Sequence, residues 1–382
     1  MKTQILKKFT AASVALASLA FVSNLHANVE VIVAGGNASR TLLFDRASNV
    51  LSGFTVYIKD ANTRSYIGGT LNGNSGLGIV NLHFAQNGAS GGLQKLRDQL
   101  TEPLAYVSTA TGFSNGVPVL VVSGSYPETV GVDSSLFNAS PTLVVPFGFI
   151  KNPVKSPALA TVTNITQRQY VYLQGSSGKL PAAFLGGSGT TTNDYVYLVG
   201  RDTAAAVRQV IDANVYATGT PSFWTTNRLL YQTNVAFNAA YNNVFANTPI
   251  GRPVPNPLLG HNSGALVVSD LNVITNAIGT VASGDFGSFT TLSYEGYQPT
   301  IQNISKGYYP IWGYENWYTK NSNPGQPSGN QILVINALRN AVTDNTYQHT
   351  AGNAFDLGKF VPLGDLEVER TQEGGPITSL LY

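Results

Sequence analysis

The sequence predicts an α/β protein with largely parallel sheets. The prediction rests on a pattern that occurs three times: an apolar, β-rich run ends in a glycine-containing turn, and a stretch with helical spacing of apolar residues follows. Strands and helices that alternate in this order build layered α/β domains. The chain has 382 residues, of which 43% are hydrophobic, so its length allows more than one lobe.

Each unit contributes a strand, a turn and a helix. In the first unit the strand is 29–34, the turn 35–36 and the helix 42–50. In the second the strand is 77–85, the turn 87–92 and the helix 93–100. In the third the strand is 195–199, the turn 200–203 and the helix 204–215. Their turns place small or polar residues at a helix start, where backbone N–H groups without an intrahelical partner can bind an anion. We expect the chain to cross between lobes at Phe147–Pro153 and again at Ile278–Val281.

Residues 1–27 have the layout of a secretory signal peptide. Three lysines precede an apolar stretch from Ala11 to Val22, and a polar end leads to Ala27. The apolar stretch is about 12 residues long, shorter than the roughly 20 that a spanning helix needs. We therefore predict cleavage after Ala27, no membrane span in the mature chain, and a periplasmic or secreted protein.

Composition excludes several classes of function. Only 11% of residues are charged, and removal of the three N-terminal lysines leaves 19 basic against 20 acidic side chains, so the chain is not a nucleic-acid binder built on basic surface. The absence of cysteine excludes disulfides, thiolate metal sites and thiol nucleophiles. The histidines lack the spacing of a metal site, and we expect neither a metal nor a cofactor.

One motif points to catalysis. Gly88–Gly92 (GASGG) fits G-x-S-x-G between a strand and a helix, as a nucleophile elbow requires, and Asp133 or Asp270 and then His349 follow in a permitted order. A serine hydrolase that uses Ser90 is one interpretation, although no HGGG-type oxyanion loop accompanies the motif. Two others stay open: Ser90 caps the helix, or its hydroxyl and the glycine N–H groups bind an oxyanion.

Taken together, the segments resemble the phosphate-binding-protein (PstS-like) group of type II periplasmic solute-binding proteins, the receptors of phosphate ABC transporters. The resemblance runs in patches over nearly the whole chain. Its segments are Val31–Ser39 (VIVAGGNAS), Asn87–Leu93 (NGASGGL), Val130–Ser134 (VGVDS), Gly200–Arg208 (GRDTAAAVR, where the family has GRDxGSGTR), His261–Gly264, Ile278–Val281 and Gly307–Trp312.

The resemblance implies a two-lobed fold with two mixed sheets, flanked by helices and joined by two crossing strands. Lobe 1 would comprise residues 28–145 plus 280–382, and lobe 2 residues 146–279. A small oxyanion such as phosphate would bind between the lobes, and an ABC transporter permease would be the partner. The implied ligand-binding residues are Ala38, Ser39, Ser90, Gly91, Asp133, Arg201 and Asp202.

The departures from the family leave alternatives open. Ala205 and Val207 stand where the family has a serine and a threonine that bind phosphate, and losing two hydrogen bonds to a charged ligand costs about 3–6 kcal/mol. Arg201 either faces the ligand or forms a surface pair with Asp202, and Asp133 either meets the anion or caps a helix. We favour a non-enzymatic solute-binding protein; the alternative is a structural or protein-interaction protein on a degenerate scaffold.

Overall fold

The computed structural model describes residues 28–86, 88–99, 104–175, 179–188, 194–201, 205–216, 261, 263–355 and 357–380. The predicted signal peptide and the predicted site residue Asp202 lie outside these ranges. Within them, no helix combines the length and the apolar character needed to cross a membrane.

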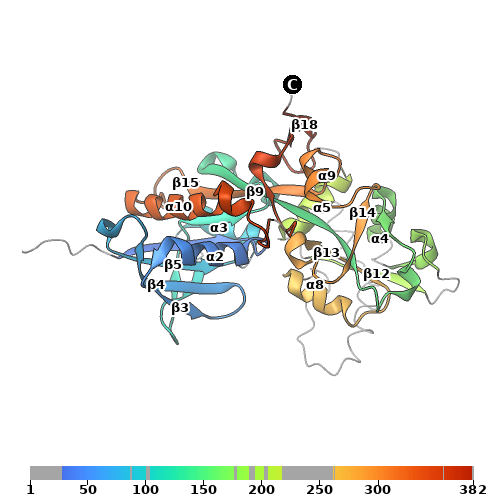
Figure 1. The fold of residues 1–382 in the computed structure, drawn as a ribbon, viewed down its shortest axis with the longest axis horizontal. Helices are drawn as coiled ribbons and strands as arrows, with labels where there is room; N and C mark the ends of the chain where they lie inside the picture. Colours follow the sequence, from blue (N-terminus) through green and yellow to red (C-terminus); the bar gives the residue numbers. More distant parts are fainter. Residues whose placement is uncertain are drawn as a thin grey trace, which may run out of the picture.

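Two lobes lie side by side along the long axis of the molecule (Figure 1), and the long strand β9 (Phe137–Lys151) runs through both. Lobe 1 contains β1 (Val29–Gly35), α2 (Arg40–Val50), β2 (Leu51–Ser52), β3 (Thr55–Ile58), β4 (Thr63–Leu71), β5 (Ile79–Ala85), α3 (Ala89–Asp98), β6 (Leu104–Val107), β7 (Phe113–Gly116), β8 (Leu120–Ser123), β15 (Trp312–Lys320), α10 (Gly329–Val342), α11 (Asn345–Gln348) and β16 (Val361–Pro362). Lobe 2 contains β10 (Asn164–Ile165), α4 (Gln167–Gly175), β11 (Lys179–Pro181), β12 (Tyr195–Val199), α5 (Ala206–Tyr216), α8 (Gly264–Leu271), β13 (Ala277–Ala282), β14 (Thr290–Tyr294) and α9 (Ile301–Ser305). A short hairpin, β17 (Val368–Glu369) and β18 (Thr378–Ser379), follows near the C-terminus.

The sheet is mixed, as the resemblance implied. The largely parallel sheets that the pattern of strands and helices predicted are not found, because β4, β9 and β15 pair only antiparallel with their described neighbours. The strand order of the sheet is β11-β12-β13-β9-β15-β8-β1-β5-β4-β2. In lobe 1, β1 is parallel to both β5 and β8. In lobe 2, β12 is parallel to β13, and β9 pairs antiparallel with β13 on this side and with β15 on the lobe 1 side. The sheets of the two lobes therefore share β9, so their hydrogen-bonded ladder is continuous.

The return from lobe 2 to lobe 1 lies later in the chain than we expected. Ile278–Val281 does not cross between the lobes, because it belongs to β13, which is buried along its whole length between β12 and β9. The chain then adds β14 to the same part of β9 and returns only with β15. Gly279, which suggested a crossing, allows β13 to pack closely against α8. A Cβ on Gly279 would lie 2.7 Å from side-chain carbons of Val267 and Leu271 in α8.

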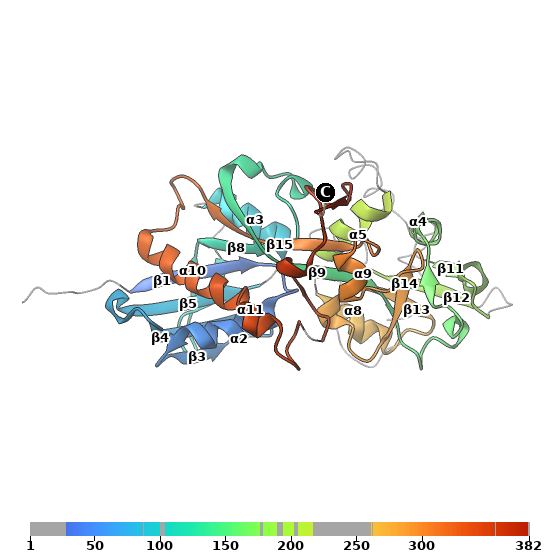
Figure 2. The ribbon, with the colours of Figure 1, turned by 45° about the horizontal axis from the view of Figure 1, so that its top comes forward.

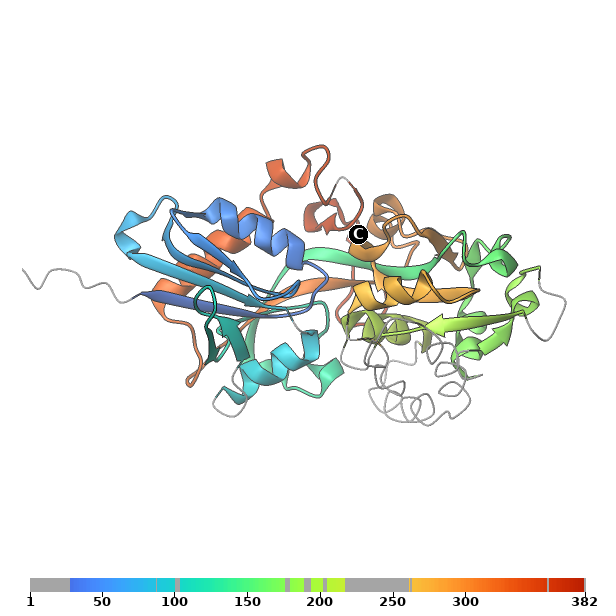
Figure 3. The ribbon, with the colours of Figure 1, turned by 90° about the horizontal axis from the view of Figure 1, so that it is seen from below.

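Helices cover both faces of the lobe 1 sheet, with α2 and α3 on opposite sides (Figure 3). Leu42, Leu43 and Val50 of α2 join the main core, whereas Leu93 and Leu96 of α3 join a second, smaller core. Full burial of a leucine or valine side chain contributes about 1.5–3 kcal/mol. The two cores thus fix the helices whose first turns point to the edge of the sheet where β1 and β5 end.

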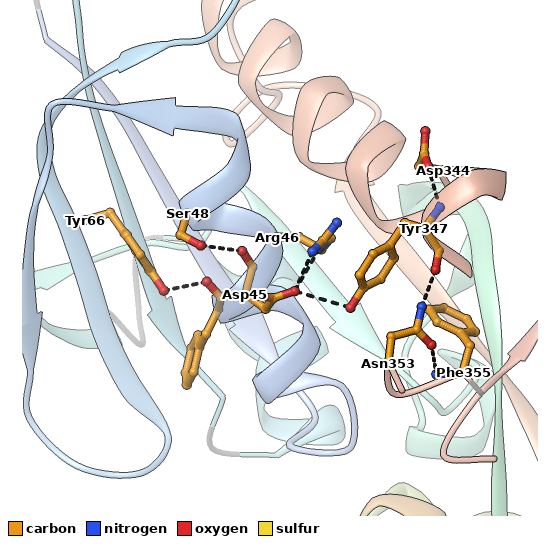
Figure 4. A network of polar contacts seen from close by, with 9 residues as sticks. Asp45, Arg46, Ser48, Tyr66, Asp344, Tyr347, Asn353 and Phe355 are labelled. Atoms are coloured by element: carbon orange, nitrogen blue, oxygen red, sulfur yellow. Dashed lines mark hydrogen bonds and ion pairs between the residues drawn. The ribbon is translucent and has the colours of Figure 1, made fainter. Parts of the chain in front are cut away.

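A polar network holds α2 against the C-terminal part of lobe 1 (Figure 4). The Arg46 guanidinium lies 3.4 Å from the ring centroid of Tyr347 in α11, and its Nη2 is 2.6 Å from Asp45 Oδ2. The Tyr347 hydroxyl donates a hydrogen bond to the same carboxylate at 3.2 Å, and Asn353 Nδ2 donates to the Tyr347 carbonyl. These contacts join segments about 300 residues apart in sequence and fix the position of α2.

The end of the chain, residues 366–380, forms a C-terminal strap above the junction of the lobes (Figure 2). Arg370 is buried and donates a hydrogen bond to Asn214 Oδ1 of α5 at 2.9 Å. Glu373 accepts a hydrogen bond from the Tyr126 backbone N–H, at 2.7 Å, in the loop after β8. The strap therefore contacts lobe 1 and lobe 2 and supports α5 from outside.

Candidate functional site

The site forms where parallel strands end. The carboxyl ends of β1, β5 and β8 meet at the edge of the lobe 1 sheet that faces lobe 2, and the helices α2 and α3 begin directly after β1 and β5. In open α/β sheets ligands bind at this edge, where loops and helix N-termini converge. Four of the predicted residues, Ala38, Ser39, Ser90 and Arg201, lie along this boundary between the lobes.

Ala38 and Ser39 stand at the start of α2. The Ala38 carbonyl faces lobe 2, because a Cβ added to Gly284, in the 3-10 turn Ser283–Asp285, would lie 3.6 Å from its oxygen. Ser39 is buried, and its hydroxyl has no hydrogen-bond partner of normal geometry among the described residues. It stands beside the Glu315 carboxyl of β15.

Glu315 is a site residue that sequence reasoning missed. The residue is only 1% exposed, and neither carboxyl oxygen makes a hydrogen bond of normal geometry with the described residues. Burial raises the pKa of Glu315 to about 7, and the Ser39 hydroxyl lowers it by less. A single acid inside the aromatic run Trp312–Tyr318 is the signal that could have identified it, because apolar strands seldom bury a lone carboxyl.

Ser90 lies in the first turn of α3 and is buried. Its hydroxyl oxygen accepts a hydrogen bond from Gln209 Nε2 of lobe 2 at 2.9 Å. Gly91 beside it is open, since a Cβ there would meet nothing within 4 Å. Gly92 is the glycine that packing requires, because a Cβ would lie 3.0 Å from the Gly35 Cα. Gly92 therefore allows α3 to approach β1 closely.

The hydrolase interpretation finds no support in this geometry. His349, the histidine that the chain order would assign to a triad, is exposed, and its ring nitrogens contact the Asn345 carbonyl at 2.8 Å and Asp365 at 3.2 Å. The Ser90 hydroxyl accepts a hydrogen bond from the Gln209 amide, which cannot act as a general base. Within the described part of the chain, no three His, Cys, Asp or Glu side chains gather as a metal site would require.

Arg201 points inward from the end of β12. The residue is 5% exposed, and its Nε donates a hydrogen bond to the His261 carbonyl at 3.1 Å. Asp285 lies within electrostatic reach of Arg201 and also of Arg40 and Lys359. Burial raises the pKa of Asp285, while these three cations lower it. Arg201 is therefore not on the surface, and Asp202, its partner in the alternative interpretation, lies outside the described residues.

The start of α5 is apolar at the two positions where the resemblance implied hydroxyl residues. Ala205 and Val207 are buried, and Val207 packs in the main core. Gln209, four residues after Ala205, turns instead toward lobe 1 and contacts Ser90. Sequence reasoning missed Gln209 because the comparison of the motif ends one residue earlier, at Arg208.

The structure does not bring Asp133 to the site. Asp133 is exposed, and its carboxylate accepts a hydrogen bond from the Ser135 backbone N–H at 2.9 Å, capping the 3-10 turn Ser134–Leu136. Hydrogen bonds from Ser135 lower its pKa. Of the two interpretations left open for Asp133, helix capping is the one that its contacts support. The carboxyl beside Ser39 is that of Glu315.

Comparison with known proteins supports the fold. A structure titled a putative phosphate ABC transporter substrate-binding protein with bound phosphate, from Clostridium perfringens, matches 87% of this chain and 99% of its own, with a TM-score of 0.51 and 11% identity. The chain has the fold of the type II periplasmic binding proteins. The ABC-type phosphate transport receptor of Vibrio cholerae matches 83% of this chain and 95% of its own (TM-score 0.48, 13% identity), and a phosphate-binding protein of Stenotrophomonas maltophilia matches 91% and 92% (TM-score 0.46, 12% identity). No protein-family model and no curated protein matches the chain.

Proposed function

We propose that this chain is an exported solute-binding protein that captures a small oxyanion between its lobes. The observation that carries the proposal is a group of buried polar side chains at the edge of lobe 1 that meets lobe 2, which make no hydrogen bond of normal geometry with the described residues. The group consists of the Ser39 hydroxyl, both amide atoms of Gln86, and both carboxyl oxygens of Glu315.

Unpartnered polar atoms are rare in a folded interior because each costs about 1–3 kcal/mol. Ser39 follows β1, Gln86 follows β5 directly, and Glu315 lies on β15, so three separate strands bring these atoms to one edge. A ligand with several oxygen atoms would supply the missing hydrogen bonds. The backbone N–H groups in the first turns of α2 and α3 point to the same edge and add donors that favour an anion.

The local charge also favours an oxyanion. Arg201, Arg40 and Lys359 all lie within electrostatic reach of Asp285, so three cations gather on this side of the junction. Glu315, with a pKa near 7, is partly protonated at neutral pH and can either donate a hydrogen bond to a ligand oxygen or accept one from a protonated anion. Phosphate fits this chemistry, and the fold neighbour from Clostridium perfringens is titled as holding phosphate.

Capture would proceed by closure of the lobes about β9 and β15, which removes the anion from water. The ligand residues would be Ala38, Ser39, Ser90, Gly91 and Arg201, with Glu315 in the place we had assigned to Asp133. Asp202 remains part of the proposal on sequence grounds. The expected setting is the periplasm, with an ABC transporter permease as partner, and the binding step needs no catalysis.

The test is titration calorimetry of the mature protein, from Asn28, after unfolding and refolding to remove bound ligand. Phosphate, sulfate and a phosphate ester are titrated into the wild type, into Arg201→Ala and into Arg168→Ala, which changes an exposed arginine of α4. We expect micromolar binding of at least one anion, lost in Arg201→Ala and kept in Arg168→Ala. Absence of binding by the folded wild type would overturn the proposal.

A second function is favoured by the start of α5. Ala205 and Val207 are packed as apolar core, and Gln209 satisfies Ser90 without a ligand. These contacts suit a structural or protein-interaction protein in which the lobes stay together permanently. Such a protein would bind none of the three anions, and its unfolding temperature would be the same with and without 10 mM phosphate. This concentration is about 1,000 times a Kd in the micromolar range, so phosphate that did bind would stabilise the folded protein by about 4 kcal/mol.

A further inference from the structure

We propose that Gln209 is a latch that holds the two lobes closed in the absence of ligand. The effect of this latch on ligand affinity rests on the proposed function, whereas lobe closure itself does not. Gln209 belongs to α5 of lobe 2, and both of its contacts described below are with lobe 1.

Both ends of the Gln209 amide are used. Nε2 donates a hydrogen bond to Ser90 Oγ at 2.9 Å, and Oε1 accepts one from Ser125 Oγ at 2.5 Å. Ser125 is itself fixed, because its backbone N–H donates to Ser123 Oγ at 3.0 Å and its carbonyl accepts from the same hydroxyl at 2.9 Å. One side chain of lobe 2 therefore joins the start of α3 to the end of β8.

The latch is sealed from water. Gln209 is 1% exposed, and Ser90 and Ser125 are also buried. The backbones around it approach closely: a Cβ on Gly124 would lie 3.4 Å from the Ala206 Cβ, and one on Gly313 would lie 3.0 Å from the Gly124 carbonyl oxygen. Water cannot replace the two hydrogen bonds while this packing is in place, so opening the lobes breaks both.

The latch also competes with the proposed ligand. Ser90 is one of the hydroxyls assigned to the anion, and Gln209 lies in the same helix as the motif in which Ala205 and Val207 replace hydroxyl residues. Two neutral hydrogen bonds correspond to about tenfold to hundredfold in an equilibrium constant. A ligand that must displace the amide binds more weakly by a similar factor.

The chain contains no cysteine, so the latch can be tested with a pair of spin labels at two introduced cysteines. Val56→Cys on β3 of lobe 1 and Val154→Cys in lobe 2 are suitable, since these valines are 40% and 83% exposed. The interlobe distance is measured by double electron–electron resonance in the ligand-free protein. The variants are Gln209→Ala, Gln209→Glu, which keeps the size and the acceptor for Ser125, and the exposed control Gln302→Ala.

We expect a single narrow distance distribution in the wild type and in Gln302→Ala, and a second, longer distance in Gln209→Ala and Gln209→Glu. An unchanged distribution in both Gln209 variants would overturn the latch. Phosphate titration is the second readout: we expect Gln209→Ala to bind about tenfold more tightly than the wild type, and equal or weaker binding would overturn displacement. If no variant binds phosphate, the proposed function fails, and the distance measurement alone decides on the latch.

Discussion

The two walls of the interlobe site differ in how their polar groups are satisfied. On the lobe 1 side, the Ser39 hydroxyl and the Glu315 carboxyl are buried without hydrogen-bond partners among the described residues. On the lobe 2 side, Arg201 donates to the His261 carbonyl and Gln209 bonds to Ser90 and Ser125. Ser39 and Glu315 of lobe 1 thus lack hydrogen bonds of normal geometry with the described residues, whereas Arg201 and Gln209 of lobe 2 make them.

This difference separates two ways of building the candidate site. The lobe 1 wall is set by main-chain geometry at the ends of β1 and β5, which the fold itself imposes. The lobe 2 wall depends on side chains at the start of α5, where Ala205 and Val207 are apolar and Gln209 is bonded to lobe 1. Under the proposed function, ligand selectivity would therefore depend mainly on lobe 2, and the capacity to bind mainly on lobe 1.

The largest effect is expected from the main-chain geometry of lobe 1. Gly35 has φ +137°, and a Cβ there would collide with the Val122 carbonyl of β8. We expect Gly35→Ala to lower the free energy of unfolding by about 3 kcal/mol or more, because neither backbone can move away. Gly91→Ala is the matched control, which we expect to stabilise the helix by about 0.5–1 kcal/mol. Urea unfolding followed by circular dichroism measures both, and a loss below about 1 kcal/mol for Gly35→Ala would contradict the account.

The second test concerns the buried carboxyl of Glu315, which makes no hydrogen bond of normal geometry with the described residues. Its folded pKa of about 7 lies above the unfolded value of 4.5, so its contribution to stability is complete below about pH 4.5 and is lost as the pH rises through 7. A difference of this size corresponds to about 3 kcal/mol between pH 4.5 and 8. We expect Glu315→Gln to remove this decrease, whereas Glu367→Gln, at an exposed residue, leaves it in place. Equal pH profiles for wild type and Glu315→Gln would show that the carboxyl reaches water or a partner.

The sequence predicted the fold class and part of lobe 1 because these depend on local patterns. Apolar runs followed by glycine turns located β1, β5 and β12, and the same turns placed Ser39 and Ser90 at the boundary of the lobes. The return crossing was misplaced because Gly279 was interpreted as a loop glycine. Gly279 in fact lies in a strand, β13, that pairs with β9 more than 120 residues away in sequence. That pairing places the glycine under α8, which one sequence does not reveal.

The side-chain partners could not be predicted in the same way. Asp133 fits a loop at a ligand as well as a helix cap, and its exposure decides for the cap. Glu315 meets Ser39 across a separation of 276 positions, and Gln209 meets Ser90 across 119. Such contacts depend on strand order and helix rotation, which periodicity in one sequence does not specify.

The smallest effect compares two buried hydroxyls of lobe 1, one that bonds to the lobe 2 wall and one that does not. Ser125→Ala removes a donor to Gln209 Oε1, so we expect a loss of about 1–2 kcal/mol in the free energy of unfolding. Ser39→Ala removes a buried hydroxyl that makes no hydrogen bond of normal geometry with the described residues, so we expect a change within about 0.5 kcal/mol, while anion affinity falls. Chemical denaturation measures the first quantity and calorimetry the second. Equal losses of stability in the two variants would mean that the Ser39 hydroxyl is satisfied inside the protein, and the contrast between the two hydroxyls would disappear.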